Sequence, residues 1–174
     1  IYHKVSSQLI STLPESYAPV GYDGDSPVGS GIKIAYPVIS AYVNALQIAE
    51  RIGDKPMQDS LVARFIPFLH EKKHLQSIDC HVDFSIFGAI PLEIFIDGIE
   101  SVSEGDMNEC FRLGMHYADH QWAEPDSTHC GGPGNATYER QLEYLQDGYS
   151  PQTRLWIDDM YMINVLQTQA YRAT

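Results

Sequence analysis

Residues 39–54, ISAYVNALQIAERIGD, set the hydrophobic periodicity from which the expected fold follows. Apolar side chains recur along this stretch at the three- and four-residue spacing of one helical face: Ile39, Tyr42, Val43 and Leu46. Gly53 and Asp54 then predict a helix stop, and Pro56 suits the first turn of a following helix. The stretch therefore predicts two helices joined by a tight turn.

Further apolar runs extend the helical pattern over the rest of the chain. The helix that starts at Pro56 should be kinked or shortened at Pro67. Three more runs follow: Phe84 to Phe95 with a stop near Gly98, Met107 to Tyr117, and Leu155 to Leu166. The last run is apolar nearly all round at its start, which predicts a helix inserted between others. Strand signals are few, so the predicted fold class is all-α.

Length and composition indicate one globular domain. The chain has 174 residues, of which 44 % are hydrophobic and 20 % are charged. No apolar run approaches the roughly 20 residues that a transmembrane helix needs, so we expect no membrane span. Asp and Glu number 23 against 11 Lys and Arg, a formal net charge of -12. This charge disfavours nucleic-acid binding, which depends on cations that neutralise phosphates, but it does not exclude an anionic small substrate.

A short internal repeat links two distant helices. Asn44-Ala45-Leu46-Gln47, followed by Glu50-Arg51, is similar to Asn164-Val165-Leu166-Gln167, followed by Tyr171-Arg172. A helix–turn–helix unit that recurs along a chain suggests a helical toroid or solenoid.

The segment from Arg154 to Met162 places two adjacent acids, Asp158 and Asp159, among large apolar side chains. Consecutive helix residues point about 100° apart, so one acid should face an apolar interior and the other should face solvent or a basic partner. A carboxyl group beside Trp156, out of water, would have a raised pKa and could serve as a general acid. The alternative is a structural carboxylate that caps the helix or forms an ion pair.

Two other segments carry candidate site residues. Asp83 precedes an apolar helix in the stretch from Asp79 to Gly88, where it either caps the helix or acts in a site with His81. His120 and Trp122 lie at the end of a predicted helix. His120 would interact favourably with the negative end of the helix dipole, and Trp122 would either stack on a sugar ring or fill the core.

The histidines invite a metal hypothesis, because two pairs are spaced four residues apart. These pairs are His70/His74 and His116/His120. No HExxH or comparable motif accompanies them, so we expect no metal site.

Together these segments resemble the unsaturated glucuronyl and rhamnogalacturonyl hydrolases of glycoside hydrolase family 105 and its relative, family 88. Trp156-Ile157-Asp158 with Tyr161-Met162 looks like that family's W-[ILV]-D-x-[LM]-[YF]-M segment. Val82-Asp83 through Gly88 looks like its x-D-x-x-x-x-G segment. Two shorter stretches, Ala118 to Trp122 and Ser150 to Arg154, also look like stretches seen in members. The similarity runs from about Ile34 to the last residue.

The resemblance implies an (α/α)6 toroid of helical hairpins that removes a 4,5-unsaturated uronic acid from the non-reducing end of lyase-generated oligosaccharides. Asp158 would protonate C4 of the double bond and then activate water for attack at C5, and Asp83 would be the second catalytic acid. The implied substrate-binding residues are Trp156, His81, Trp122, Arg154 and His120. No metal or organic cofactor is implied, and the setting would be the bacterial cytoplasm or periplasm. The loops Pro14 to Gly31 and Asp126 to Asn135 would select the neighbouring sugar.

Two other functions fit the same sequence. One is a non-catalytic helical module that binds carbohydrate or protein, and the other is a different (α/α)6 sugar enzyme such as an epimerase. About seven helical runs use about 25 residues each, so twelve helices need about 300 residues. We therefore expect residues 1–174 to be a single catalytic domain in the form of an incomplete (α/α)6 barrel, truncated after Thr174.

Overall fold

The computed structural model describes residues 2–12, 36–70, 82–125 and 136–174. All regular secondary structure within these ranges is helical, which confirms the all-α class. The two loops expected to select the neighbouring sugar lie outside the described residues. None of the described helices is long and apolar enough to cross a bilayer.

The described chain begins with α1 (Tyr2–Thr12), a helix that was not predicted. The next two helices, α2 (Tyr36–Ile52) and α3 (Lys55–Phe65), follow the sequence signals closely. Gly53 adopts a left-handed φ of 69° at the stop, and Asp54 caps α3 by accepting a 3.2 Å hydrogen bond from the backbone N of Met57. Pro67 shortens α3 as predicted, because the chain continues past Phe65 as the 3-10 turn η1 (Ile66–His70).

The apolar run from Phe84 to Phe95 is divided where a single helix was predicted. It forms α4 (Val82–Ser85), the 3-10 turn η3 (Ile86–Gly88) and α5 (Ala89–Asp97). Pro91 accounts for the break, since a proline has no N–H to donate and its ring clashes with the carbonyl four residues earlier. It is tolerated in the first turn of α5, so the α-helix restarts just before it. The stop at Gly98 is confirmed by its left-handed φ of 57°.

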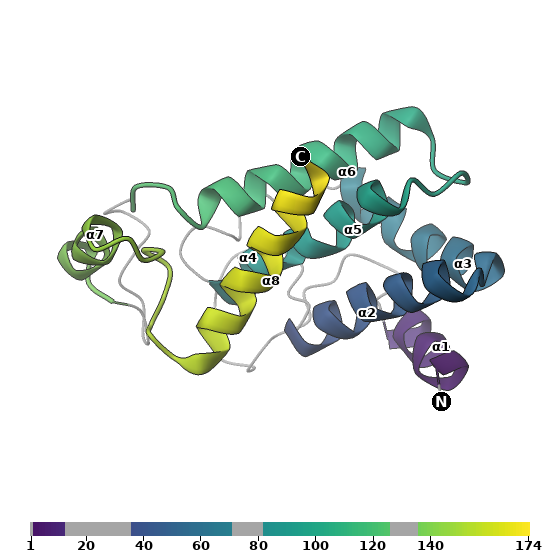
Figure 1. The fold of residues 1–174 in the computed structure, drawn as a ribbon, viewed down its shortest axis with the longest axis horizontal. Helices are drawn as coiled ribbons and strands as arrows, with labels where there is room; N and C mark the ends of the chain where they lie inside the picture. The colour runs from purple at the N-terminus through teal and green to yellow at the C-terminus, as the bar shows by residue number, and fades with distance from the viewer. Residues whose placement is uncertain (1, 13–35, 71–81, 126–135) are drawn as a thin grey trace.

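Three helices complete the described chain: α6 (Glu104–His120), α7 (Tyr138–Gln146) and α8 (Ile157–Ala173). Ser103 caps α6 by accepting a hydrogen bond from the backbone N of Asp106, and Thr137 caps α7 in the same way. α7 lies at one end of the molecule, and α1 and α3 lie at the other (Figure 1).

The centre of the fold is α5, which packs against α2, α6 and α8. Every residue from Ala89 to Ile94 is buried, including Glu93. Two glycines, Gly88 and Gly114, allow α6 to pack closely against η3 and α5. A Cβ on Gly88 would lie 2.6 Å from Tyr117 Cβ, and one on Gly114 would lie 2.3 Å from Leu92 Cγ. The packing of α2 and α8 on α5 positions the polar cluster around Glu93 that is described below.

The start of α8 differs from the prediction that it is inserted between other helices. Leu155, Trp156 and Ile157 are 50 %, 56 % and 83 % exposed. Burial begins with Asp159 and continues along one face through Met162, Ile163 and Leu166. The first turn thus presents apolar side chains to solvent, because only the later turns of α8 pack on α5 and α6.

Candidate functional site

A buried ion pair fixes the turn that leads into α8. Asp159 Oδ1 accepts a 2.5 Å hydrogen bond from Arg154 Nη2, and its Oδ2 accepts another of 2.5 Å from the Arg154 backbone N. The Asp159 side chain is fully buried and that of Arg154 is 12 % exposed. Removing one partner of such a pair strands a charge out of water, which typically costs about 3–5 kcal/mol. The sequence allowed one of the two adjacent acids to form a structural ion pair, and that acid is Asp159.

Trp156 is held outward on this turn. The Arg154 guanidinium carbon lies 4.5 Å from the centre of the indole ring, a cation–π contact. Leu155, between them, has a φ of 60°, a left-handed conformation that is strained for a leucine. Its backbone N donates a 2.9 Å hydrogen bond to Thr153 Oγ1. The Arg154 donors Nε and Nη2 bind Asp159, so they are engaged within the protein rather than directed at a ligand.

Asp158 is exposed at the second residue of α8. The sequence predicted that one of the two adjacent acids faces the interior, and Asp159 takes that position while Asp158 points away from it. Two aromatic side chains of the same segment are also exposed: Trp156, two residues before Asp158, and Tyr161, 45 % exposed, one turn after it on α8. Asp158 is therefore an accessible carboxylate in a segment that also exposes aromatic side chains.

A buried glutamine joins the segments around Asp158. Gln121 Nε2 donates to Ser85 Oγ of α4 at 2.9 Å, and its Oε1 accepts from Gln167 Nε2 of α8 at 3.1 Å. Its backbone carbonyl accepts from Ser150 Oγ at 2.5 Å. Gln121 is fully buried, so each of these bonds replaces one that water would otherwise make. The junction ties α4, the end of α6, the turn before α8 and α8 itself together.

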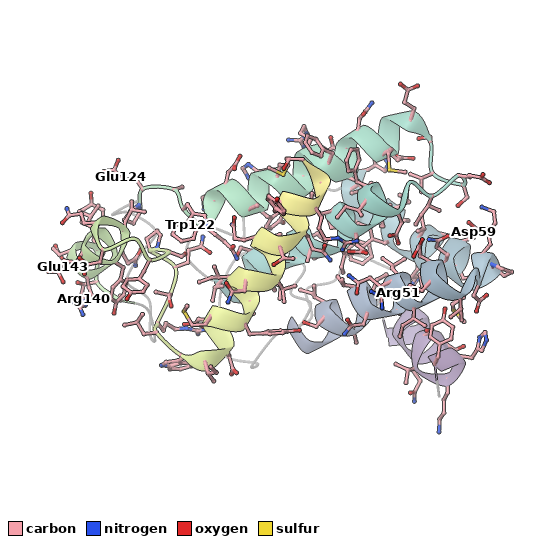
Figure 2. All side chains as sticks on the ribbon, in the orientation of Figure 1. Arg51, Asp59, Trp122, Glu124, Arg140 and Glu143 are labelled. Carbon is pink, nitrogen blue, oxygen red and sulfur yellow. The ribbon has the colours of Figure 1, made fainter. Side chains whose placement is uncertain are left out.

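Trp122 follows this junction and does not fill the core, since 40 % of its surface is exposed (Figure 2). His120, in the last turn of α6, stacks with His116 at a ring separation of 6.0 Å. The backbone carbonyl of His120 accepts a hydrogen bond from Gln152 Nε2 at 3.2 Å, which links it to the turn before α8.

Asp83 is the second residue of α4, and α4 contacts α8. α4 therefore packs against the helix whose first turn carries Asp158. His81 lies outside the described residues, as does His74 of the first histidine pair. His70 forms a 3.0 Å contact with Asp106 across the molecule. The described residues contain no group of three or more His, Cys, Asp or Glu side chains arranged to hold a metal ion.

A second polar cluster, centred on Glu93, was missed by the sequence reasoning. Glu93 Oε2 accepts hydrogen bonds from Gln47 of α2 at 3.1 Å, from Arg172 of α8 at 2.8 Å, and from Gln169 of α8. The signal was present in the sequence, because Glu93 is the single charged residue between Ala89 and Ile96.

Asp97 lies one turn beyond Glu93 and is hydrogen-bonded to it. Burial, assisted by the negative charges of Glu93 and Glu50 and opposed by Arg172, raises the pKa of Asp97 to about 7. Near neutral pH, Asp97 is therefore poised to share its proton with Glu93. This Glu93 cluster joins α2, α5 and α8 by polar contacts in the middle of the fold.

Comparison with models of known protein families found no match. Searches of curated proteins and of solved structures also found none. The candidate site is therefore defined by its own residues and their geometry.

Proposed function

We propose that this chain is a glycoside hydrolase that removes a 4,5-unsaturated uronic acid from the non-reducing end of lyase-generated oligosaccharides. The observation that carries the proposal is Asp158, an accessible carboxylate two residues after the exposed Trp156, on a helix that contacts the segment bearing Asp83. The sequence resemblance to the unsaturated uronyl hydrolases falls on these same residues.

The proposed chemistry hydrates an enol ether. Asp158, in its protonated form, delivers a proton to C4 of the double bond, and the positive charge that develops at C5 is shared with the ring oxygen. The resulting carboxylate then takes a proton from water as that water attacks C5. The product is a hemiketal, which opens and releases the sugar.

Asp158 must carry a proton in the first step of the reaction. A bound uronate favours this protonated form in two ways. Its sugar ring covers the Asp158 carboxyl and excludes water from it, and its uronate group adds a negative charge nearby, so the complex disfavours a second negative charge on Asp158. Substrate binding thus prepares the acid.

The proposed architecture is an (α/α)6 toroid. Two features support it: α2 with α3 and α5 with α6 pack as consecutive helix pairs, and α2, α5 and α8 form one continuous layer. In such a toroid these three helices would line the inner ring, and the start of α8 would face the central cleft.

The test is loss of the ultraviolet absorbance of the unsaturated bond. Fragments from lyase-digested pectin, ulvan and glycosaminoglycans are supplied as substrates. Asp158→Asn should lower turnover at least about 1,000-fold with the helical circular dichroism unchanged. Asp147→Asn, the same change at an exposed position, should leave turnover as it is. Unchanged turnover in Asp158→Asn, or no turnover of any fragment by the unaltered protein, would overturn the proposal.

A further inference from the structure

A pocket of about 660 Å³ lies between α2, α5 and α8, within the size range of small-molecule sites. It is lined from Tyr161 to Arg172 along α8, and Asp158 does not line it. Gln169 at its floor is eleven residues from Asp158, or about 16 Å along the helix axis. The floor of the pocket therefore lies away from Asp158, although its near end, at Tyr161, is one turn of α8 from that residue.

The internal repeat forms two facing walls of this pocket. Asn44 and Arg51 from the first copy line it on α2, and Asn164 and Arg172 from the second copy line it on α8. Figure 2 labels Arg51 on α2. The side chains of Asn44 and Asn164 are exposed within the pocket and carry both donors and acceptors. Thr168, also exposed on α8, adds a hydroxyl of the same dual character.

The floor of the pocket has unused hydrogen-bonding capacity. Ser40 Oγ, Glu93 Oε1 and Asp97 Oδ2 are buried and accept no hydrogen bond from a described amide, hydroxyl or guanidinium group. The proton shared by the two carboxyl groups still leaves lone pairs on both. Glu93 is fully buried and lines the pocket, so the hydroxyl group of a ligand could donate the hydrogen bond that Glu93 Oε1 lacks.

The charges that line the pocket balance. Arg51 and Arg172 are positive, and Glu50 and Glu93 are negative. Asp97, with a pKa of about 7, adds at most a partial negative charge near neutral pH. A pocket whose net charge is close to zero and which has donors and acceptors on every wall has no strong preference for an anion or a cation. It matches a ligand whose groups each donate and accept, as hydroxyl groups do.

We propose that this pocket binds an uncharged, polyhydroxylated ligand of one or two sugar rings. The amide and hydroxyl side chains of Asn44, Asn164 and Thr168 bind its rim hydroxyls, and Glu93 accepts from the hydroxyl that reaches the floor. Tyr161, at one end of the pocket, offers its ring to the apolar face of the sugar.

The test compares three probes that share one ring and differ in charge: D-glucose, D-glucuronate and D-glucosamine. Binding is measured by titration calorimetry and by amide chemical shifts near neutral pH, with maltose as a two-ring probe. We expect saturable millimolar binding of glucose and maltose, at least about fivefold tighter than that of the two charged sugars. Tighter binding of glucosamine or of glucuronate, or no saturation up to about 50 mM glucose or maltose, would overturn the proposal.

Variants place the binding in the pocket. Asn164→Ala and Thr168→Ala each remove one neutral hydrogen bond at an exposed position, so affinity should fall about fivefold while the fold remains intact. Asn108→Ala removes an exposed amide on α6, outside the pocket, and should not change affinity. Equal affinity in all three variants would refute the assignment. None of these probes has an unsaturated bond, so the result is independent of the proposed hydrolysis.

Discussion

The raised pKa of Asp97 makes the stability of this protein depend on pH in a defined direction. The carboxyl group has a reference pKa of 3.8 and a pKa of about 7 in the folded protein. The folded state therefore holds this proton more tightly than the unfolded chain does. The stabilisation is complete below about pH 4 and is lost as the pH rises through about 7.

The magnitude follows from the pKa difference and the surroundings of the group. A difference of about 3 pH units at ~1.4 kcal/mol per unit gives ~4 kcal/mol as an upper limit. Asp97 is only partly buried, so water screens its interaction with Glu93 and Glu50, and we halve this to about 2 kcal/mol. For a chain of this length, that corresponds to about 4–8 °C in Tm.

The assay is urea unfolding of the wild type and of Asp97→Asn between about pH 4.5 and 8, followed by far-ultraviolet circular dichroism. The amide that this substitution introduces donates to Glu93 without titrating. As the pH rises from about 4.5 to 8, the unfolding free energy of the variant should therefore increase by about 2 kcal/mol relative to that of the wild type. The comparison cancels the titration of groups that both proteins share.

The control is Asp147→Asn, which makes the same charge change at an exposed position. Its unfolding free energy should follow that of the wild type at every pH. Parallel curves for Asp97→Asn and the wild type, or a variant that is less stable at pH 8, would refute the argument that these two carboxyl groups share a proton.

Two further predictions concern the backbone. Gly114→Ala places a methyl group 2.3 Å from Leu92 Cγ, so chemical denaturation should show a loss of about 1–3 kcal/mol, whereas Gly105→Ala, where the nearest atom is 3.9 Å away, should not. Leu155→Gly relieves the left-handed conformation at φ 60°, so stability should stay the same or rise by up to about 1 kcal/mol. Leu142→Gly, in the middle of α7, should lower it by about 1 kcal/mol or more, and an equal loss at Leu155 would contradict the strain argument.

Local sequence signals predicted the helix boundaries well where one residue restricts the backbone. Gly53 and Gly98 both adopt the positive φ that ends a helix, and Asp54 caps the next one. Pro67 ends α3 as expected, but Pro91 also divided a run that was predicted to be continuous. These signals act within one turn of the chain, so they can be read without knowledge of the rest of the fold.

The surroundings of the candidate site residues could not be read in the same way. The sequence placed two acids at the start of α8, and it required that they point apart. Which of the two faces the interior depends on where α4, α6 and the turn before α8 lie, and the tertiary structure gave that position to Asp159 and left Asp158 exposed.

The sequence by itself determined an all-α protein, its main helix boundaries and the residues that bear the resemblance to uronyl hydrolases. Only the tertiary structure decided that Glu93 joins three helices, and that the two copies of the repeat face one another across a pocket. The physical reason is range. Backbone preferences and caps depend on near neighbours in the chain, whereas burial, charge pairing and pKa depend on residues that are 46 and 79 positions apart in the chain.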